Sequence, residues 1–97
     1  MTEEADSPEE IALRLRHLQH AVGSETASAF AARVGLTQRQ YDNFVHARGR
    51  PGLDAGLKIC RTTGVTLDWL YRGKTSGLPL HIFNLLQDTK ASEGNPE

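Results

Sequence analysis

The chain has 97 residues, of which 38% are hydrophobic and 24% are charged, as is typical of one small globular domain. No stretch approaches the roughly 18 consecutive apolar residues of a membrane helix, and the acidic start lacks the apolar run of a secretory signal. The single cysteine, Cys60, excludes an internal disulfide and a cysteine-rich zinc site, and it indicates a reducing, cytoplasmic setting.

The formal net charge of −1 hides an uneven distribution along the chain. Residues 1–10 carry five acidic side chains and no basic one. Residues 11–73 carry nine Lys or Arg against four Asp or Glu, a net charge of +5. A basic middle between acidic ends is a weak indication of an anionic partner. On composition alone, a solvated surface of mixed charge is the simpler interpretation.

Polar cap residues followed by apolar residues at helical spacing predict three helices in the first half of the chain. Ser7 and Thr37 are each followed three residues later by Glu or Gln, the capping-box pattern that opens a helix. Gly23 and Gly35 are expected to end the first and second helices in the left-handed conformation. The predicted helices cover about residues 8–22, 26–34 and 38–46.

Three more helices are predicted in the second half, after a basic loop at 47–52. The fourth covers 53–63 and is expected to bury Leu53, Leu57 and Cys60, which are spaced along one face. A short fifth helix covers 67–71, and a sixth, amphipathic helix runs from Pro79 to about Asp88. Residues 1–6 and 89–97 are expected to be disordered. With no alternating strand pattern, the chain is predicted to be all-α.

The segment 26–45 holds two short helices joined by only Gly35, Leu36 and Thr37. So short a connection forces a sharp crossing angle, and the small Ala31 stands where the two helices meet. This arrangement predicts a helix-turn-helix whose second helix is presented outward. On spacing alone, a plain helical bundle explains the pattern equally well.

The run from Thr26 to Tyr71 resembles the Cro and phage-repressor type of helix-turn-helix domain, the Xre family. The residues that carry the resemblance are Ala31, Gly35, Thr37, Tyr41, Phe44, Arg48, Arg50, Pro51, Leu53, Leu57, Gly64-Val65-Thr66-Leu67-Asp68 and Leu70. The resemblance implies a five-helix, lambda-repressor-like fold, usually dimeric, that binds operator DNA and regulates transcription. It would occupy residues 7–73, followed by a linker and an additional C-terminal helix over 74–88.

Three residues depart from the family pattern. Ala27 stands where the family usually has a phosphate-contacting Gln, Ala47 replaces a common Gly, and Gly52 replaces a polar cap. The first change removes one backbone contact, and the other two make the geometry of the 47–52 loop uncertain.

The exposed side of the third helix holds the candidate base-reading residues. Residues near the start of a helix in the major groove meet base edges, and the family's reading positions include Gln38, Arg39 and Asn43. Arg pairs bidentately with guanine, whereas Gln and Asn do so with adenine. Asp42 would accept from cytosine N4 or hold Arg39 in place. The alternative for all four is a solvated polar face.

Residues around that face are expected to touch phosphates, which supply affinity without sequence information. They are Thr37, Gln40, His46, Arg48 and Arg50. Ordinary surface polarity is the alternative, and for Arg33 and Lys58 it is the preferred one.

The sixth helix is too short to be stable unless it docks. It would fold back on its own domain or pair with the same segment of a second chain, and the resemblance to repressors that read palindromic sites as dimers favours the second arrangement. The predicted interface residues are Trp69, Leu78, Ile82, Phe83 and Leu86.

The remaining candidates favour binding over catalysis. His17 and His20 are spaced for a metal pair, but nothing in the sequence completes the site, so surface histidines are expected. Cys60 is expected to be a small core residue. With no catalytic constellation legible, the chain is predicted to be no enzyme and to hold no cofactor or metal.

The prediction is therefore a sequence-specific regulator that binds double-stranded DNA, acting as a repressor and a homodimer on a palindromic operator. An antitoxin or a protein-interaction adaptor with the same fold is the alternative.

Overall fold

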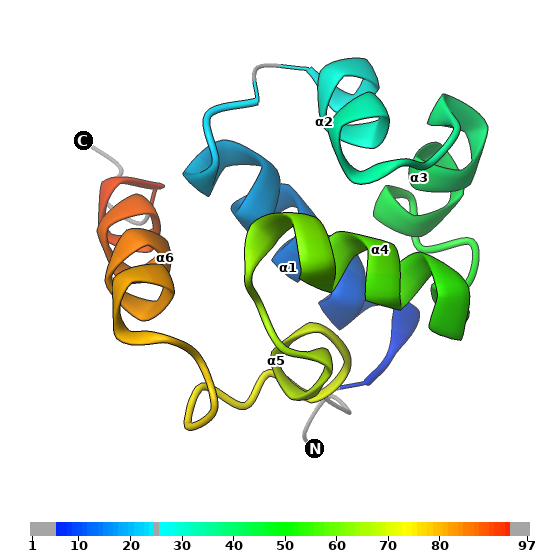
Figure 1. Cartoon of the computed structure of the whole chain (residues 1–97). Coiled ribbons are helices and arrows are strands. Elements are labelled where there is room, and N and C mark those ends of the chain that lie inside the picture. Colours follow the sequence, from blue (N-terminus) through cyan, green and yellow to red (C-terminus); the bar gives the residue numbers. More distant parts are fainter. Residues whose placement is uncertain (1–5, 25, 94–97) are drawn as a thin grey trace.

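The computed structural model describes residues 6–24 and 26–93, with side chains described as far as residue 89 (Figure 1). These residues form six α-helices and no β-strand, which confirms the all-α prediction. The helices are α1 (Pro8–Ala21), α2 (Ala27–Val34), α3 (Gln38–Val45), α4 (Leu53–Thr63), α5 (Leu67–Arg72) and α6 (Leu80–Glu93). None of the helices in the described ranges has the length and apolar character to cross a membrane.

Most of the helices begin where a side chain satisfies a backbone N–H that the first turn leaves unpaired. The hydroxyls of Ser7, Thr26, Thr37 and Thr66 each accept a hydrogen bond from the amide three residues further on. The predicted capping box at Thr37 is complete, with reciprocal bonds to Gln40. At α4 the capping residue is Gly52, which offers no side chain for this purpose.

The hydrophobic core is built around α1, which packs against α3, α5 and α6 (Figure 1). α2 and α4 close the core by packing on each other, while α2 also contacts α3 and α4 contacts α5. Large side chains from the first five helices are fully buried there, a degree of burial that is typical of a stable small domain. They are Ile11, Leu15, Leu18, Phe30, Tyr41, Ile59 and Leu70.

α6 folds back on its own domain. Ile82 and Leu86 are 7% and 4% exposed and belong to the same core as α1. His17 Nε2 lies 2.7 Å from the carbonyl oxygen of Leu86, and the Ile82 side chain lies against Gly64 at the end of α4. Of the two arrangements that the sequence left open for this helix, the structure shows the intramolecular one.

The limits of α6 differ from those predicted. It begins at Leu80 instead of Pro79, and it continues to Glu93, past the predicted end near Asp88. The sequence has no glycine or proline between Pro79 and Gly94, so nothing stops the helix at residue 88. The predicted disorder of residues 1–5 and 94–97 lies outside the described residues, whereas that of 89–93 is wrong.

The buried face of α4 is also rotated from the predicted one. Leu53 is 64% exposed, and Leu57 and Cys60 are only partly buried. The inward residues are instead the small or branched side chains Ala55, Gly56, Ile59 and Thr63. Gly56 is inward because the Tyr71 ring lies where a side chain at this position would stand, with its hydroxyl 2.5 Å from the ideal Cβ position.

Candidate nucleic-acid interface

α2 and α3 are joined by a tight turn whose geometry depends on Gly35. This residue has φ 85°, in the left-handed region that glycine adopts without steric cost. The next amide, Leu36 N–H, bonds back to Ala31 O at 2.9 Å, and the Leu36 side chain is 6% exposed. Lys58 Nζ lies 3.4 Å from Gly35 O and caps the turn from α4. The turn therefore fixes the direction in which α3 leaves α2.

α3 is anchored to the core by Tyr41, whose side chain is fully buried. Its hydroxyl donates to Gln19 Oε1 at 2.8 Å and lies 3.3 Å from Leu15 O, both on α1. Its ring packs on Phe30 of α2, with the ring centroids 5.1 Å apart. Burial raises the pKa of the Tyr41 phenol well above its ordinary value, because the phenolate would lose its hydration.

A second tie holds the C-terminal end of α3. Arg16 Nη2 on α1 donates to Val45 O at 2.6 Å, so a cation meets a carbonyl at the negative end of the helix dipole. Val45 itself is 6% exposed. α3 is thus fixed through its middle and its end, and its first turn is the part that faces outward.

The predicted base-reading residues divide into two pairs. Gln38 and Arg39 are exposed in the first turn, and the structure shows no hydrogen bond or ion pair from either to another described residue. Asp42 and Asn43, one turn later, are half-buried. All four lie on α3, and the first two present their full set of polar atoms to solvent.

Asn43 is bonded to a residue that was predicted to contact phosphate. Arg48 Nη1 donates to Asn43 Oδ1 at 3.2 Å, and the Arg48 amide donates to Asn43 O at 2.9 Å. The Asn43 oxygen is therefore engaged, while its amide nitrogen keeps two donors. An amide held in this way has its orientation set by Arg48, and it keeps two donors and one acceptor lone pair for a base edge.

The other predicted phosphate contacts lie at the two ends of α3. Thr37 and Gln40 bond each other, with Gln40 Oε1 accepting from Thr37 N–H at 2.9 Å and Thr37 Oγ1 accepting from Gln40 N–H at 3.0 Å. These bonds use acceptor atoms and leave the Thr37 hydroxyl proton and the Gln40 amide donors for an anion. At the other end, His46 Nδ1 lies 2.8 Å from Asp42 O.

The loop after α3 contains the one described non-glycine residue with a positive φ. Ala47 has φ 60°, in the left-handed region that a residue with a side chain rarely adopts. Beyond it, Arg50 is exposed and has no hydrogen bond or ion pair with another described residue, while Pro51 is buried. The loop therefore projects Arg50 outward from a backbone that is strained at one point.

Tyr71 fixes this loop, a role that the sequence reasoning missed. Its hydroxyl lies 2.6 Å from Pro51 O and 3.0 Å from Gly52 O. Burial raises the pKa of the Tyr71 phenol, and the nearby Cys60 adds to that shift. The sequence feature that could have indicated this role of Tyr71 is Gly56 on the facing side of α4, because only a residue without a side chain leaves room for the ring.

The two basic side chains predicted to be ordinary surface charges both hold backbone carbonyls. Arg33 Nη1 donates to Val22 O at 2.9 Å, and Lys58 Nζ lies near Gly35 O as described above. Both remain exposed.

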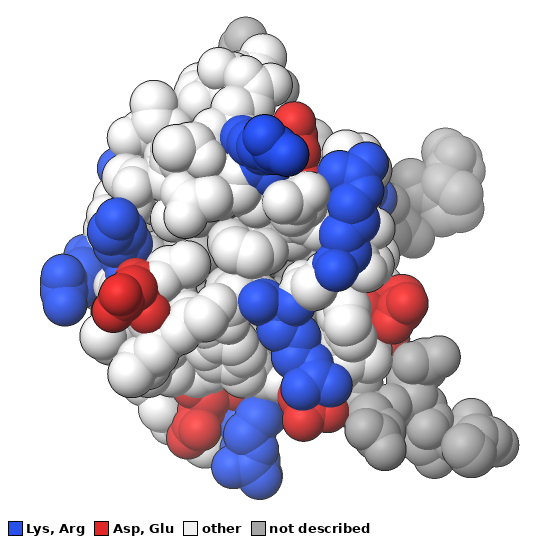
Figure 2. All heavy atoms as spheres, turned by 90° about the vertical axis from the view of Figure 1, so that its right-hand side faces the viewer, with Lys and Arg blue, Asp and Glu red and all other residues white. Residues whose placement is uncertain are grey.

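Figure 2 views the molecule from the side where α3 lies in Figure 1, and on this face Lys and Arg side chains are scattered, with acidic groups between them.

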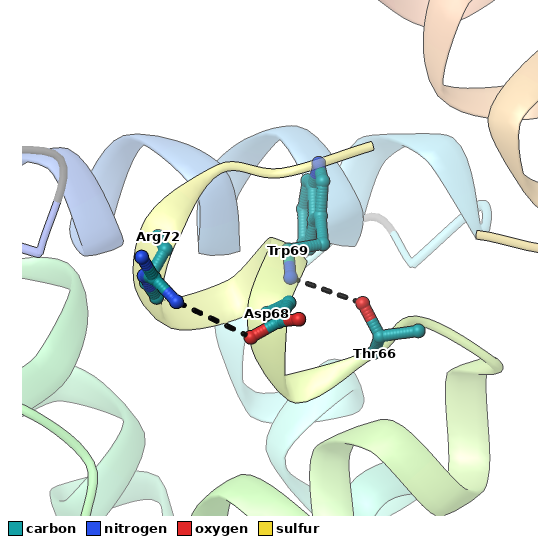
Figure 3. Close-up of polar contacts among 4 residues, drawn as sticks. All are labelled: Thr66, Asp68, Trp69 and Arg72. Carbon is teal, nitrogen blue, oxygen red and sulfur yellow. Dashed lines mark hydrogen bonds and ion pairs between the residues drawn. The ribbon is translucent and has the colours of Figure 1, made fainter. Parts of the chain in front are cut away.

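Three of the five predicted dimer-interface residues are buried within the chain, and the other two are half-buried. Trp69 is 5% exposed, and its ring extends from α5 toward α1, while its amide bonds Thr66 Oγ1 at 3.0 Å (Figure 3). Ile82 and Leu86 are buried, as described for α6, and Leu78 and Phe83 are half-buried. The fold-back of α6 supplies the physical reason: the apolar face expected to meet a second chain meets α1.

The histidine pair offers no metal site in the described part of the chain. No group of three or more His, Cys, Asp or Glu side chains that would hold a metal ion occurs there. His17 contacts Leu86 O, whereas His20 is exposed. Cys60 is half-buried, and its surroundings raise the pKa of its thiol to about 11 by desolvation.

The chain has no significant match among family models, curated proteins or solved structures. Any functional conclusion therefore depends on the residues and the geometry described above.

Proposed function

We propose that the chain is a sequence-specific DNA-binding regulator of the helix-turn-helix type, with α3 as the helix that enters the major groove. The observation that carries the proposal is the pair Gln38 and Arg39, two long polar side chains exposed and unbonded on a helix that is otherwise tightly fixed. Such a helix presents hydrogen-bonding groups in a constant orientation, which direct readout of base edges requires.

The chemistry of the flanking residues supports the same ligand. Thr37 and Gln40 keep donors at the start of α3, and Arg50 projects from the loop beyond its end. Donors and cations at both ends of a groove-binding helix suit the phosphates on either side of the groove. In this arrangement Arg39 pairs with guanine. Arg48 contacts a phosphate and also orients the side chain of Asn43.

The regulator would act as a repressor by occupying an operator and blocking polymerase, as a homodimer on two half-sites about 34 Å apart. Because Ile82 and Leu86 are buried within the chain, the dimer surface in this proposal does not include them. The exposed apolar side chains Leu80 (72%) and Leu85 (38%) on α6 are the available alternatives.

The test begins with selection of a preferred duplex from random sequences, followed by binding measurements over a range of salt. Wild type should prefer the selected duplex by about a thousandfold over a scrambled one, and both affinities should fall steeply with salt. Arg39→Ala should lower the preference about tenfold to a hundredfold and leave non-specific binding nearly intact.

Arg61→Ala is the matched control, because Arg61 is exposed in the last turn of α4, at the end away from the basic loop. This variant should keep the full preference. Equal losses in Arg39→Ala and Arg61→Ala would contradict readout by α3. Failure of the wild type to bind any duplex at low salt would instead favour the protein-interaction adaptor, and copurification with a small toxin would favour the antitoxin.

A further inference from the structure

A cavity of about 380 Å³ lies between α1, α5 and α6, away from the α3 surface. One face of α1 forms one wall and α6 forms the other. Trp69 lies at the α5 end, and the connection between α5 and α6 forms the rim. Its lining consists of Glu10, Leu13, Arg14, His17, Trp69, Gly73, Thr75, Leu78, Phe83, Leu86 and Gln87.

Five of the eleven residues that line the α1–α6 cavity have apolar side chains, and two of these are aromatic. Phe83 is half-buried whereas Trp69 is 5% exposed, so Phe83 is the aromatic side chain that a partner ring would mainly contact. Leu13 is 58% exposed and adds an accessible apolar side chain to the α1 wall. A volume of this size falls in the range of pockets that hold small molecules.

The charged groups of the cavity balance each other. Glu10 and Arg14 have opposite signs, and the carboxylate of Glu10 partly offsets the lowering of the Arg14 pKa that burial causes. Arg14 Nε already donates to Leu70 O at 2.9 Å, and His17 Nε2 is engaged by Leu86 O. A ligand with a net charge would gain little here and would lose its hydration. Thr75 and Gln87 at the exposed edge still offer neutral hydrogen-bonding groups.

We propose that the α1–α6 cavity is a binding site for a small, neutral aromatic molecule that packs against Phe83 and Leu13, with the buried Trp69 at its α5 end. None of the residues in the proposed DNA surface lines this cavity, so the two sites are separate. The ligand site stands independently of DNA binding, and its test requires no DNA.

The test uses N-phenyl-1-naphthylamine, a neutral aromatic probe whose fluorescence rises in an apolar site. Trp69 is the only tryptophan in the chain and lines the cavity, so its emission responds to a probe bound there. Titration of the full chain should give saturable one-to-one binding, with a dissociation constant on the order of 10–100 µM. Trp69 emission should fall over the same concentration range, because the bound probe accepts its energy at short distance.

Leu13→Glu should weaken probe binding about tenfold or more, because it places a carboxylate at the apolar wall. Leu53→Glu is the matched control, since Leu53 is similarly exposed (64%) but does not line the cavity. It should bind the probe like wild type. Both variants change exposed side chains, and their thermal unfolding should match that of the wild type.

Three outcomes would overturn the proposal. They are the absence of saturable binding, unchanged binding in Leu13→Glu, and equal weakening in both leucine variants, which would indicate general surface adsorption.

Discussion

α3 and α6 both pack against α1, but they leave different kinds of surface exposed. α3 buries Tyr41 and Val45 and presents Gln38 and Arg39 to solvent. α6 buries Ile82 and Leu86 and leaves Leu80 and Leu85 exposed. A fixed helix with free polar groups is suited to a polar, patterned ligand such as DNA, whereas a helix that is apolar on two sides is suited to apolar contacts. The same central helix therefore supports two surfaces of opposite chemistry.

The largest expected effect is the loss of stability when a buried side chain of α6 is replaced. Ile82→Asp should lower the free energy of unfolding by about 4 kcal/mol, because it removes a buried branched side chain and leaves a carboxylate without a partner. Denaturant unfolding followed by circular dichroism measures this. Leu85→Asp, on the exposed side of the same helix, should cost less than about 1 kcal/mol.

A different result for Ile82→Asp would be expected if α6 served mainly as a dimer contact. Ile82→Asp would then convert a dimer to a folded monomer in sedimentation, with little change in the stability of the monomer. That result would contradict the fold-back of α6 on α1.

A smaller effect is expected at the anchor of α3. Tyr41→Phe keeps the buried ring but removes the hydroxyl that bonds Gln19, so it should cost about 1.5 kcal/mol of stability. It should also weaken the preference for the selected duplex, because α3 loses a tie to α1. Tyr71→Phe provides the comparison, since it loosens the loop at Pro51 instead. An unchanged melting temperature in Tyr41→Phe would show that the hydroxyl bond contributes nothing to the anchor.

Alkaline pH should destabilise the fold through buried groups outside α6, because burial raises the pKa values of Tyr41, Tyr71 and Cys60. The raised pKa of Tyr41 means that the unfolded chain ionises first as pH rises above about 10. For Tyr41 both states are protonated below pH 10, whereas above it stability falls until the folded phenol also ionises. Cys60, whose pKa burial raises from 9 to about 11, adds a loss of stability that begins near pH 9. Tyrosinate absorbance at 295 nm should therefore rise together with the loss of helix. Tyrosine ionisation at pH 10 in a chain that stays helical would contradict the buried geometry.

The sequence predicted the helices well because their ends depend on local chemistry. Thr37 with Gln40 and Gly35 specify a helix start and a left-handed turn within a few residues. The end of α6 was misplaced because composition suggested disorder, while the local stop signal comes only at Gly94. Local signals were thus more reliable than composition.

Features that depend on contacts between distant residues were predicted less well. The predicted buried face of α4 was wrong because apolar spacing gives Leu53 more weight than Gly56, whereas Gly56 is the inward residue that leaves room for the Tyr71 ring. The position of α6 and the link between Asn43 and Arg48 likewise require the fold. The sequence therefore predicted which residues of α3 face outward, and the structure was needed to show which of them are already bonded.

The smallest expected effect is a change in stability at Ala47, in the loop after α3. Ala47 has φ 60°, a conformation that costs a side-chain-bearing residue about 1–2 kcal/mol. Glycine removes that cost but loses more backbone entropy on folding, so Ala47→Gly should stabilise the chain by about 0.5 kcal/mol. Ala32→Gly, at an exposed position inside α2, is the matched control and should destabilise by about 1 kcal/mol. Opposite signs in denaturant unfolding would show that the strain at Ala47 is real and local to the loop. A loss of stability in both variants would mean that the loop accommodates Ala47 without strain. The backbone of the loop that carries Arg50 would then be as free of strain as that of α3.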